Sequence, residues 1–358
     1  MKTFDRYKKN EIFLAAIASS FFLLYGLTPY ILNEMGLFVI DEATENLVFS
    51  LIAACFPLIL VFLFSNAGKQ LSTGSINLHG KFIFLVFLVS VCVFYAFPWH
   101  DDRESAGASV AAVFRGLWLV LMVSCYGEPR AKTLRLILMT LILMVVDQSR
   151  TAFGLALFVL GLSFSVKSLS VLILLMSASA AWRMGESDGF LNDVMYGLVG
   201  EGYNGAKGAL QAISVKDFEI DYFSHIFQLI FQPIITVFQI ALTKFDFGDL
   251  DSTRHIGELT EKYLGQVYSP MGGFYIAAEF AYYGLIGLFL LFIYLFITYW
   301  LTKRLFDTDK FPAGSLLFII SIKATPYVYW KYVIYLYLIK LLLIALSRFS
   351  RRFRFIAF

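Results

Sequence analysis

Charged residues are scarce in this chain: only 15% of its 358 residues are Asp, Glu, Lys or Arg, whereas 59% are hydrophobic and 18% are aromatic. This number of charged residues is too small to cover the surface of a soluble globular protein. Water is therefore not the main solvent of the chain. The formal net charge is only +3, and the basic residues are spread over short segments. We therefore expect membrane lipids as surroundings and no nucleic acid as a partner.

Cysteines and familiar catalytic motifs are also few or missing. Cys55, Cys92 and Cys125 all fall in apolar runs, so the sequence offers neither a disulfide framework nor a CxxC metal or redox motif. HExxH, GxSxG, Walker and dinucleotide-binding patterns are absent, and no group of residues has the spacing of metal ligands. We expect no metal site and no cofactor, and ATP-driven or redox chemistry is disfavoured.

Long apolar runs, in contrast, are abundant. A helix needs about 20 mostly apolar residues to cross the hydrocarbon core, where its backbone must satisfy its own hydrogen bonds. We predict an all-α, polytopic transmembrane bundle of about ten spans in a single integral membrane domain, residues 1–358. The predicted spans cover residues 12–32, 47–65, 82–98, 109–125, 134–147, 151–166, 168–182, 273–301, 312–330 and 332–347.

Basic residues between the apolar runs predict the orientation of the chain. Connectors on the side of the amino terminus are basic, whereas the opposite connectors are acidic or mixed. By the positive-inside rule we expect both termini in the cytoplasm. The basic connectors and the tail contain Lys69, Lys81, Arg130, Lys132, Arg135, Lys167, Lys303, Arg304, Lys310, Arg348, Arg351, Arg352 and Arg354.

One large hydrophilic segment, residues 183–272, is predicted on the far side of the membrane from the termini. Within it, residues 222–244 form an apolar stretch that is broken by Pro233 and three glutamines. This composition favours a helix that lies along the membrane interface or dips into it. A further true span is the alternative, but it would turn the later basic connectors outward.

Charges at predicted bilayer depth, or at its outer edge, are the first candidate functional residues. Such a charge costs about 2.5–3.5 kcal/mol on insertion scales, which singles out Arg115, Lys323 and Lys340. The two lysines could instead snorkel or form structural pairs, whereas Arg115 could line an outward cavity and bind an anion. Asp147 and Arg150 lie at an outer turn, where arginine can hold phosphate bidentately. A helix-capping role is the plain alternative there.

A second group of candidates lies near the end of the outer segment. Arg254 and His255 are adjacent, and Glu279 lies at the top of a long apolar span. A histidine can act as acid or base near neutral pH, and burial would raise the pKa of Glu279 and suit it to proton transfer. A surface histidine without a role, or a glutamate paired with an arginine, would be the plain alternatives.

Taken together, these features resemble the O-antigen polymerase and ligase superfamily, specifically the Wzy-type polymerases of bacterial surface polysaccharide. The architecture carries the resemblance over the whole chain, and a few residues support it. They are Ser149-Arg150-Thr151-Ala152 at the opening of a span, Tyr268-Ser269-Pro270, and Glu279 followed by Tyr283-Gly284-Leu285-Ile286-Gly287.

The resemblance implies a fold like that of the GT-C glycosyltransferases and a metal-independent glycosyltransferase of the bacterial inner membrane, with its active site facing the periplasm. Its substrates would be undecaprenyl-diphosphate-linked oligosaccharides. The growing glycan would move from its lipid diphosphate to the non-reducing end of a new lipid-linked repeat unit. A chain-length-regulating co-polymerase is a further partner that this resemblance would allow.

These expectations assign roles to the candidate residues. Arginines would neutralise the departing diphosphate, an acidic or basic side chain would deprotonate the acceptor hydroxyl, and tyrosines could stack on sugar faces. His255 and Glu279 remain alternatives for the base. The predicted catalytic residues are Arg150, Arg254, His255 and Glu279, and the predicted substrate-binding residues are Arg115, Asp147, Arg183, Tyr203 and Tyr268.

Two other functions use the same features. An O-antigen ligase would take the same donor but deliver the glycan to a lipid A core. A flippase for lipid-linked oligosaccharides would use Arg115, Lys323 and Lys340 to line a translocation path. Such a transporter would favour inverted repeats and short loops on both sides, and neither is visible in the sequence.

Overall fold

The computed structural model describes residues 2–34, 36, 43–64, 80–97, 106–147, 150–160, 222–241, 276, 280–281, 283–308, 311–324 and 326–352. Within these ranges the chain is helical and contains no strand, so the all-α prediction is confirmed for this part of the chain. The residues cluster into two compact units, Met1–Gln70 with Val199–Ile334, and Leu71–Leu198 with Tyr335–Phe358. The single domain and the GT-C fold stay predictions.

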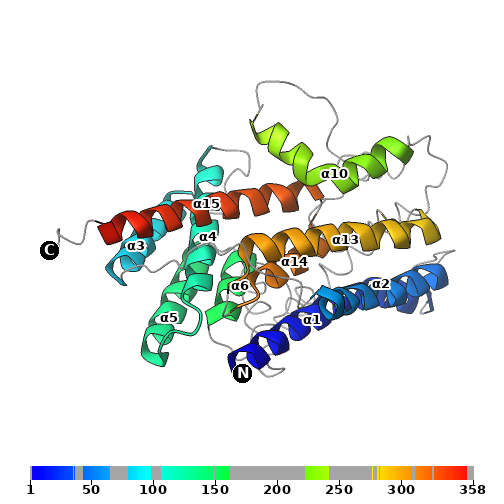
Figure 1. Cartoon of the computed structure of the whole chain (residues 1–358), viewed down its shortest axis with the longest axis horizontal. Coiled ribbons are helices and arrows are strands. Elements are labelled where there is room, and N and C mark those ends of the chain that lie inside the picture. The colour runs from blue at the N-terminus through cyan, green and yellow to red at the C-terminus, as the bar shows by residue number, and fades with distance from the viewer. Residues whose placement is uncertain are drawn as a thin grey trace. The chain divides into compact units, whose positions relative to one another are not determined.

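The first unit is built around a long helical pair and a helical hairpin. It contains α1 (Lys2–Glu34), α2 (Ala43–Phe64), α10 (Tyr222–Ala241), α13 (Gly284–Phe306), α14 (Ala313–Lys323) and the start of α15 (Pro326–Arg352). Helix α1 packs along α2 and against α14, while α13 packs against α2, α10 and α14 (Figure 1). This packing joins helices from the start of the sequence to helices from its last third in one unit.

Small residues allow α1 and α2 to approach closely. A Cβ atom on Gly26 would lie 2.5 Å from the Cβ and Oγ atoms of Ser50, and 3.0 Å from the carbonyl oxygen of Asn46. Ala18 and Ala15 are buried about two and three turns further back along α1. Because lipid provides no hydrophobic force between apolar helices, such close backbone packing is a main source of their association.

The second unit contains α3 (Gly80–Ala96), α4 (Ala106–Ser124), α5 (Arg130–Asp147), α6 (Arg150–Leu160) and the later part of α15. Helices α3 and α6 each pack against both α4 and α5. A short turn reverses the chain between α4 and α5, and Gly127 takes a φ of 82° there, which other residues rarely adopt. The reversal makes α4 and α5 antiparallel neighbours.

Four helices of the described residues are long and apolar enough to cross a membrane. They are Tyr7–Leu27, Ala43–Phe64, Gly284–Phe306 and Tyr329–Ser347. Shorter apolar helices occur at Gly80–Ala96, Val110–Ser124, Leu229–Phe238 and Ala313–Ile322. The predicted transmembrane character is confirmed at this level, whereas the ten-span count and the orientation stay predictions.

Two predicted spans have different ends in the structure. Within the span predicted at 273–301, helix α13 begins at Gly284, whose φ of 58° lies in the left-handed region. The span predicted at 312–330 ends as α14 at Lys323, because Ala324 is extended and Pro326 starts the next helix. With 11 residues, α14 is only about 16 Å long, roughly half of the hydrocarbon core.

Helix α10, the apolar stretch of the predicted outer segment, turns its polar side inward. Gln232 and Thr236 are fully buried, and the Gln232 amide donates to the Thr236 hydroxyl at 3.4 Å. Phe227 and Ile234, on the opposite side, are 58% and 54% exposed. A helix lying at the interface would turn polar residues toward water, so this inverted arrangement suits surroundings of acyl chains around α10.

Replacing Gly314 by alanine is expected to lower the free energy of unfolding by about 1–3 kcal/mol. A Cβ atom there would lie 2.5 Å from the Cα and N atoms of Lys303 and from the carbonyl oxygen of Thr302, so α14 would have to move away from α13. Unfolding in detergent by added SDS would measure the loss. Gly80→Ala is the matched control, because nothing lies within 4 Å of its Cβ position; equal losses would contradict the close packing at Gly314.

Candidate functional site

A buried ion pair joins two of the predicted substrate-binding residues, Arg115 of α4 and Asp147 of α5. The Nε and Nη2 atoms of Arg115 donate to the Oδ2 and Oδ1 atoms of Asp147, both at 2.7 Å. Arg115 is only 6% exposed and Asp147 is fully buried. This two-bond geometry fixes the plane of the guanidinium group, which a single contact would leave free to rotate.

Neighbouring side chains hold the pair in place. The guanidinium carbon of Arg115 lies 5.7 Å from the centre of the Phe94 ring, a distance at which the ring attracts a cation. One turn along α4, the Trp118 indole N–H donates to the Thr140 hydroxyl of α5 at 3.0 Å. These contacts set the register between α4 and α5, so Arg115 meets Asp147 rather than a residue one turn away.

The ion pair lies next to the start of the following helix. Asp147 is the last residue of α5, and α6 begins at Arg150, as the sequence predicted for this span. The side chain of Arg150 is outside the described residues, but its backbone opens a helix whose first amide groups carry partial positive charge. Two arginines and an aspartate are therefore associated with the α5–α6 corner.

The remaining predicted site residues lie outside the described residues. They are Arg183, Tyr203, Arg254, His255, Tyr268 and Glu279. Of the predicted outer segment, 183–272, only α10 is described. The predicted roles of these residues stay predictions. Of the two lysines singled out in the spans, Lys340 is buried in α15, and Lys323 is the last residue of α14.

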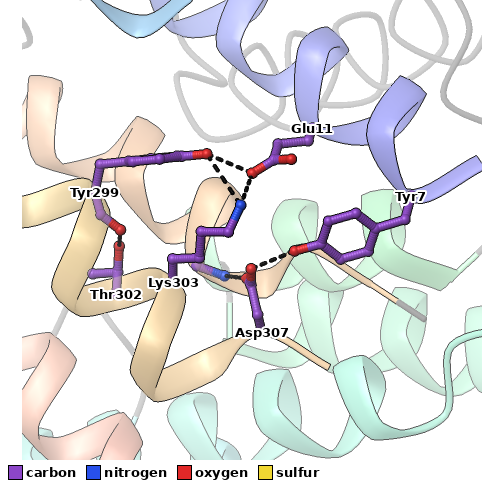
Figure 2. Close-up of polar contacts among 7 residues, drawn as sticks. Tyr7, Glu11, Tyr299, Thr302, Lys303 and Asp307 are labelled. Atoms are coloured by element: carbon purple, nitrogen blue, oxygen red, sulfur yellow. Dashed lines mark hydrogen bonds and ion pairs between the residues drawn. The ribbon is translucent and has the colours of Figure 1, made fainter. Parts of the chain in front are cut away.

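A second buried polar cluster, which the sequence analysis did not anticipate, joins α1 to α13. Figure 2 shows Lys303 between two tyrosines, with its ammonium group donating to Oε1 of Glu11. The Tyr299 hydroxyl donates to the same oxygen. The Lys303 nitrogen lies 5.4 Å from the Tyr299 ring centre and 5.8 Å from that of Tyr7. Aromatic faces and one carboxylate thus surround the ammonium group.

Asp307 completes the cluster just beyond the end of α13. Its Oδ2 atom accepts a hydrogen bond from the Tyr7 hydroxyl, and its Oδ1 atom accepts one from the Gly314 backbone N–H at 2.8 Å. Asp307 thereby ties α1 and α14 to the end of α13. Burial raises the pKa of this carboxyl to about 7, although its bond from Tyr7 and the charge of Lys303 oppose the rise.

Lys303 had been assigned to a basic connector at the end of a predicted span, and the structure instead places it in α13, buried and paired. A sequence signal for the cluster existed: Tyr7 and Glu11 are four residues apart, as are Tyr299, Lys303 and Asp307 in turn. Such spacing forms a polar stripe on one face of a helix. Spacing alone does not tell which two stripes face each other.

Comparison with protein-family models, with curated proteins and with solved structures finds no match to this chain. The class of protein is therefore inferred from the sequence and the structure of the chain. Its described residues are helical, four of its helices are long and apolar enough to span a membrane, and two buried ion pairs join helices of the chain. These features define a helical membrane protein with buried ionic clusters.

Proposed function

We propose that the chain is a polymerase of bacterial surface polysaccharide. It would transfer the growing glycan from undecaprenyl diphosphate to the non-reducing end of a new lipid-linked repeat unit, on the periplasmic face of the inner membrane. The observation that carries the proposal is the buried Arg115–Asp147 pair beside the start of α6 at Arg150. This pair belongs to the outer edge of the bundle in the predicted orientation.

The chemistry of the reaction suits such a corner. Its leaving group is a lipid diphosphate, whose negative charge increases as the glycosidic bond breaks. Fixed positive groups that meet this charge lower the barrier without a nucleotide or a metal. The Arg115–Asp147 pair is neutral as a whole and anchors the end of α5, three residues before Arg150. Arg150 and the first amides of α6 then supply the positive side of the site.

The other roles in this proposal come from the sequence. Arg254 would be the second guanidinium on the diphosphate, assisted by Arg183, and either His255 or Glu279 would take the proton of the acceptor hydroxyl. Tyr203 and Tyr268 would bind the sugars by stacking, which tolerates a variety of rings. A chain-length-regulating co-polymerase would act from outside this site.

Deletion of the gene tests the reaction, because the lipopolysaccharide ladder distinguishes the candidates. Core bearing a single repeat unit is the expected result for a polymerase, whereas core bearing none indicates a ligase or a flippase.

In the complemented strain, Arg150→Ala is expected to reduce long ladders by about 100-fold or more, since it removes a donor to the leaving group. Arg130→Ala is the matched control, an exposed arginine at the first residue of α5. Full ladders from Arg150→Ala, with normal membrane insertion, would contradict the proposal.

A flippase for lipid-linked oligosaccharides is the second candidate, and the interruption between α14 and α15 favours it. Discontinuous helices at membrane depth are common in transporters, where their ends face the substrate. Here the break is at Ala324, between Lys323 and Pro326. A flippase predicts that repeat units stay on the cytoplasmic face in the deletion strain, which periplasm-restricted labelling of the sugar would detect.

A further inference from the structure

We propose that the buried cluster of Tyr7, Glu11, Tyr299, Lys303 and Asp307 is a proton-binding site, which takes up one proton per chain on the Asp307 carboxyl. The site belongs to the α1, α13 and α14 helices of the first unit, whereas Arg115, Asp147 and Arg150 belong to the second. The inference is therefore independent of the polymerase proposal.

The charges of the cluster do not balance without an added proton. Glu11 and Asp307 are carboxyl groups, and Lys303 is the ammonium group that Figure 2 shows between them. Glu11 is fully buried, Asp307 is 7% exposed and Lys303 is 9% exposed. Two carboxylates against one ammonium group would leave a net negative charge away from water, which is costly. One bound proton makes the cluster neutral.

The hydrogen bonds indicate which carboxyl binds the proton. Oε1 of Glu11 accepts bonds from both Lys303 and Tyr299, so its charge has a direct counter-ion. Within the described part of the chain, Asp307 accepts from two neutral donors, the Tyr7 hydroxyl and the Gly314 backbone N–H. Since neutral donors stabilise a carboxylate less than a cation does, Asp307 is the carboxyl that a proton neutralises at the least cost.

The Glu11 carboxylate is itself incompletely paired, because its Oε2 atom is buried and has no hydrogen-bond partner among the described residues. Buried carboxylate oxygens are normally paired, so the cluster already bears the cost of one incompletely solvated carboxylate. A second uncompensated negative charge, on Asp307, would add to this cost, and a proton on Asp307 removes that second charge.

Acid should therefore stabilise the contact between α1 and the α13–α14 hairpin. Burial raises the pKa of Asp307 from 3.8 to about 7, against the lowering effects of Tyr7, Lys303 and Gly314 and with a further rise from Glu11. Between these two pH values the folded chain holds a proton that the unfolded chain has released. The stabilising contribution of Asp307 is thus complete below pH 3.8 and is lost as the pH rises through about 7.

Infrared difference spectra of the purified full-length chain, between about pH 5 and about pH 9, would test the site. We expect the carbonyl band of one protonated carboxyl group, which disappears with a midpoint near 7. The band should be absent from Asp307→Asn, whose amide oxygen can still accept the Gly314 N–H while its NH2 group donates to the Tyr7 hydroxyl oxygen. It should remain in Glu128→Gln, which alters an acid in the half-exposed pair with Lys132.

A second variant tests the mechanism without removing the carboxyl. Tyr7→Phe deletes a hydrogen bond that stabilises the Asp307 carboxylate, so the midpoint should move to higher pH. The proposal is overturned by a wild-type chain that shows no such band, or by a band that persists in Asp307→Asn. It is also overturned if the band is absent and the unfolding midpoint follows sodium concentration, since the cluster would then hold a metal cation instead.

Discussion

Replacing Arg115 by methionine is expected to lower the free energy of unfolding by about 3–5 kcal/mol, because the variant leaves the Asp147 carboxylate buried without its counter-ion. In the wild-type chain the Arg115 guanidinium group donates two hydrogen bonds to the Asp147 carboxylate, at 2.7 Å each. Unfolding in mild detergent against increasing SDS, followed by tryptophan fluorescence, would measure the loss. An unchanged unfolding midpoint would contradict a buried, paired Asp147.

A compensating variant separates stability from function at the same pair. Arg115→Met combined with Asp147→Leu removes both charges, and apolar replacements of buried ion pairs are often neutral or stabilising. We expect this double variant to regain most of the lost stability. Under the polymerase proposal it would nonetheless make short ladders, because the corner beside Arg150 has lost its polar anchor. Full ladders from a stable double variant would reduce the pair to a structural role.

Replacing Lys303 by methionine is expected to have a similarly large effect, about 3–5 kcal/mol. Among the described residues, the variant leaves Tyr299 as the one hydrogen-bond donor to the Glu11 carboxylate, while Asp307 loses the nearby positive charge that lowers its pKa. The same SDS titration measures the loss. Adding Glu11→Gln should restore stability, because the cluster then contains no uncompensated charge once Asp307 is protonated.

The neighbouring residue provides the control for Lys303. Arg304→Met also removes a positive charge from the last turn of α13, but Arg304 is exposed and its guanidinium carbon lies 4.1 Å from the centre of the Trp300 ring. Exposed cation–π contacts contribute about 0.5–1 kcal/mol, so a loss of that size or less is expected. Equal losses at positions 303 and 304 would show that charge in the last turn, rather than the buried pair, stabilises the helix.

Several features of the fold could be predicted from local sequence. Apolar runs located α1, α2, α13 and α15 as candidate spans, because the free energy of inserting a helix is a sum over its own residues. The turn between α5 and α6 was also found, since polar residues Asp147 to Arg150 separate two apolar runs. The ends of α13 and α14 were missed, because a single glycine in a left-handed conformation and a proline interrupt runs that hydropathy treats as continuous.

The candidate site was predicted only in part. Arg115 and Asp147 were both predicted as substrate-binding residues. Arg115 was expected to bind an anion, and Asp147 was placed at an outer turn. Their pairing with each other was not predicted. Lys303 was predicted as a connector charge, and Glu11 was not singled out. The residue type at a position shows that a charge is present, but it does not show whether another helix buries that charge.

The sequence by itself determined the solvent of this protein and the location of its four long apolar helices, because transfer from water to lipid depends on the residues of each segment alone. The tertiary structure decided which charges meet: Arg115 with Asp147, 32 residues away, and Glu11 with Lys303, 292 residues away. Such pairs form only when helix packing brings two polar stripes together and excludes water from both. That exclusion turns a connector lysine and a terminal glutamate into an internal ion pair.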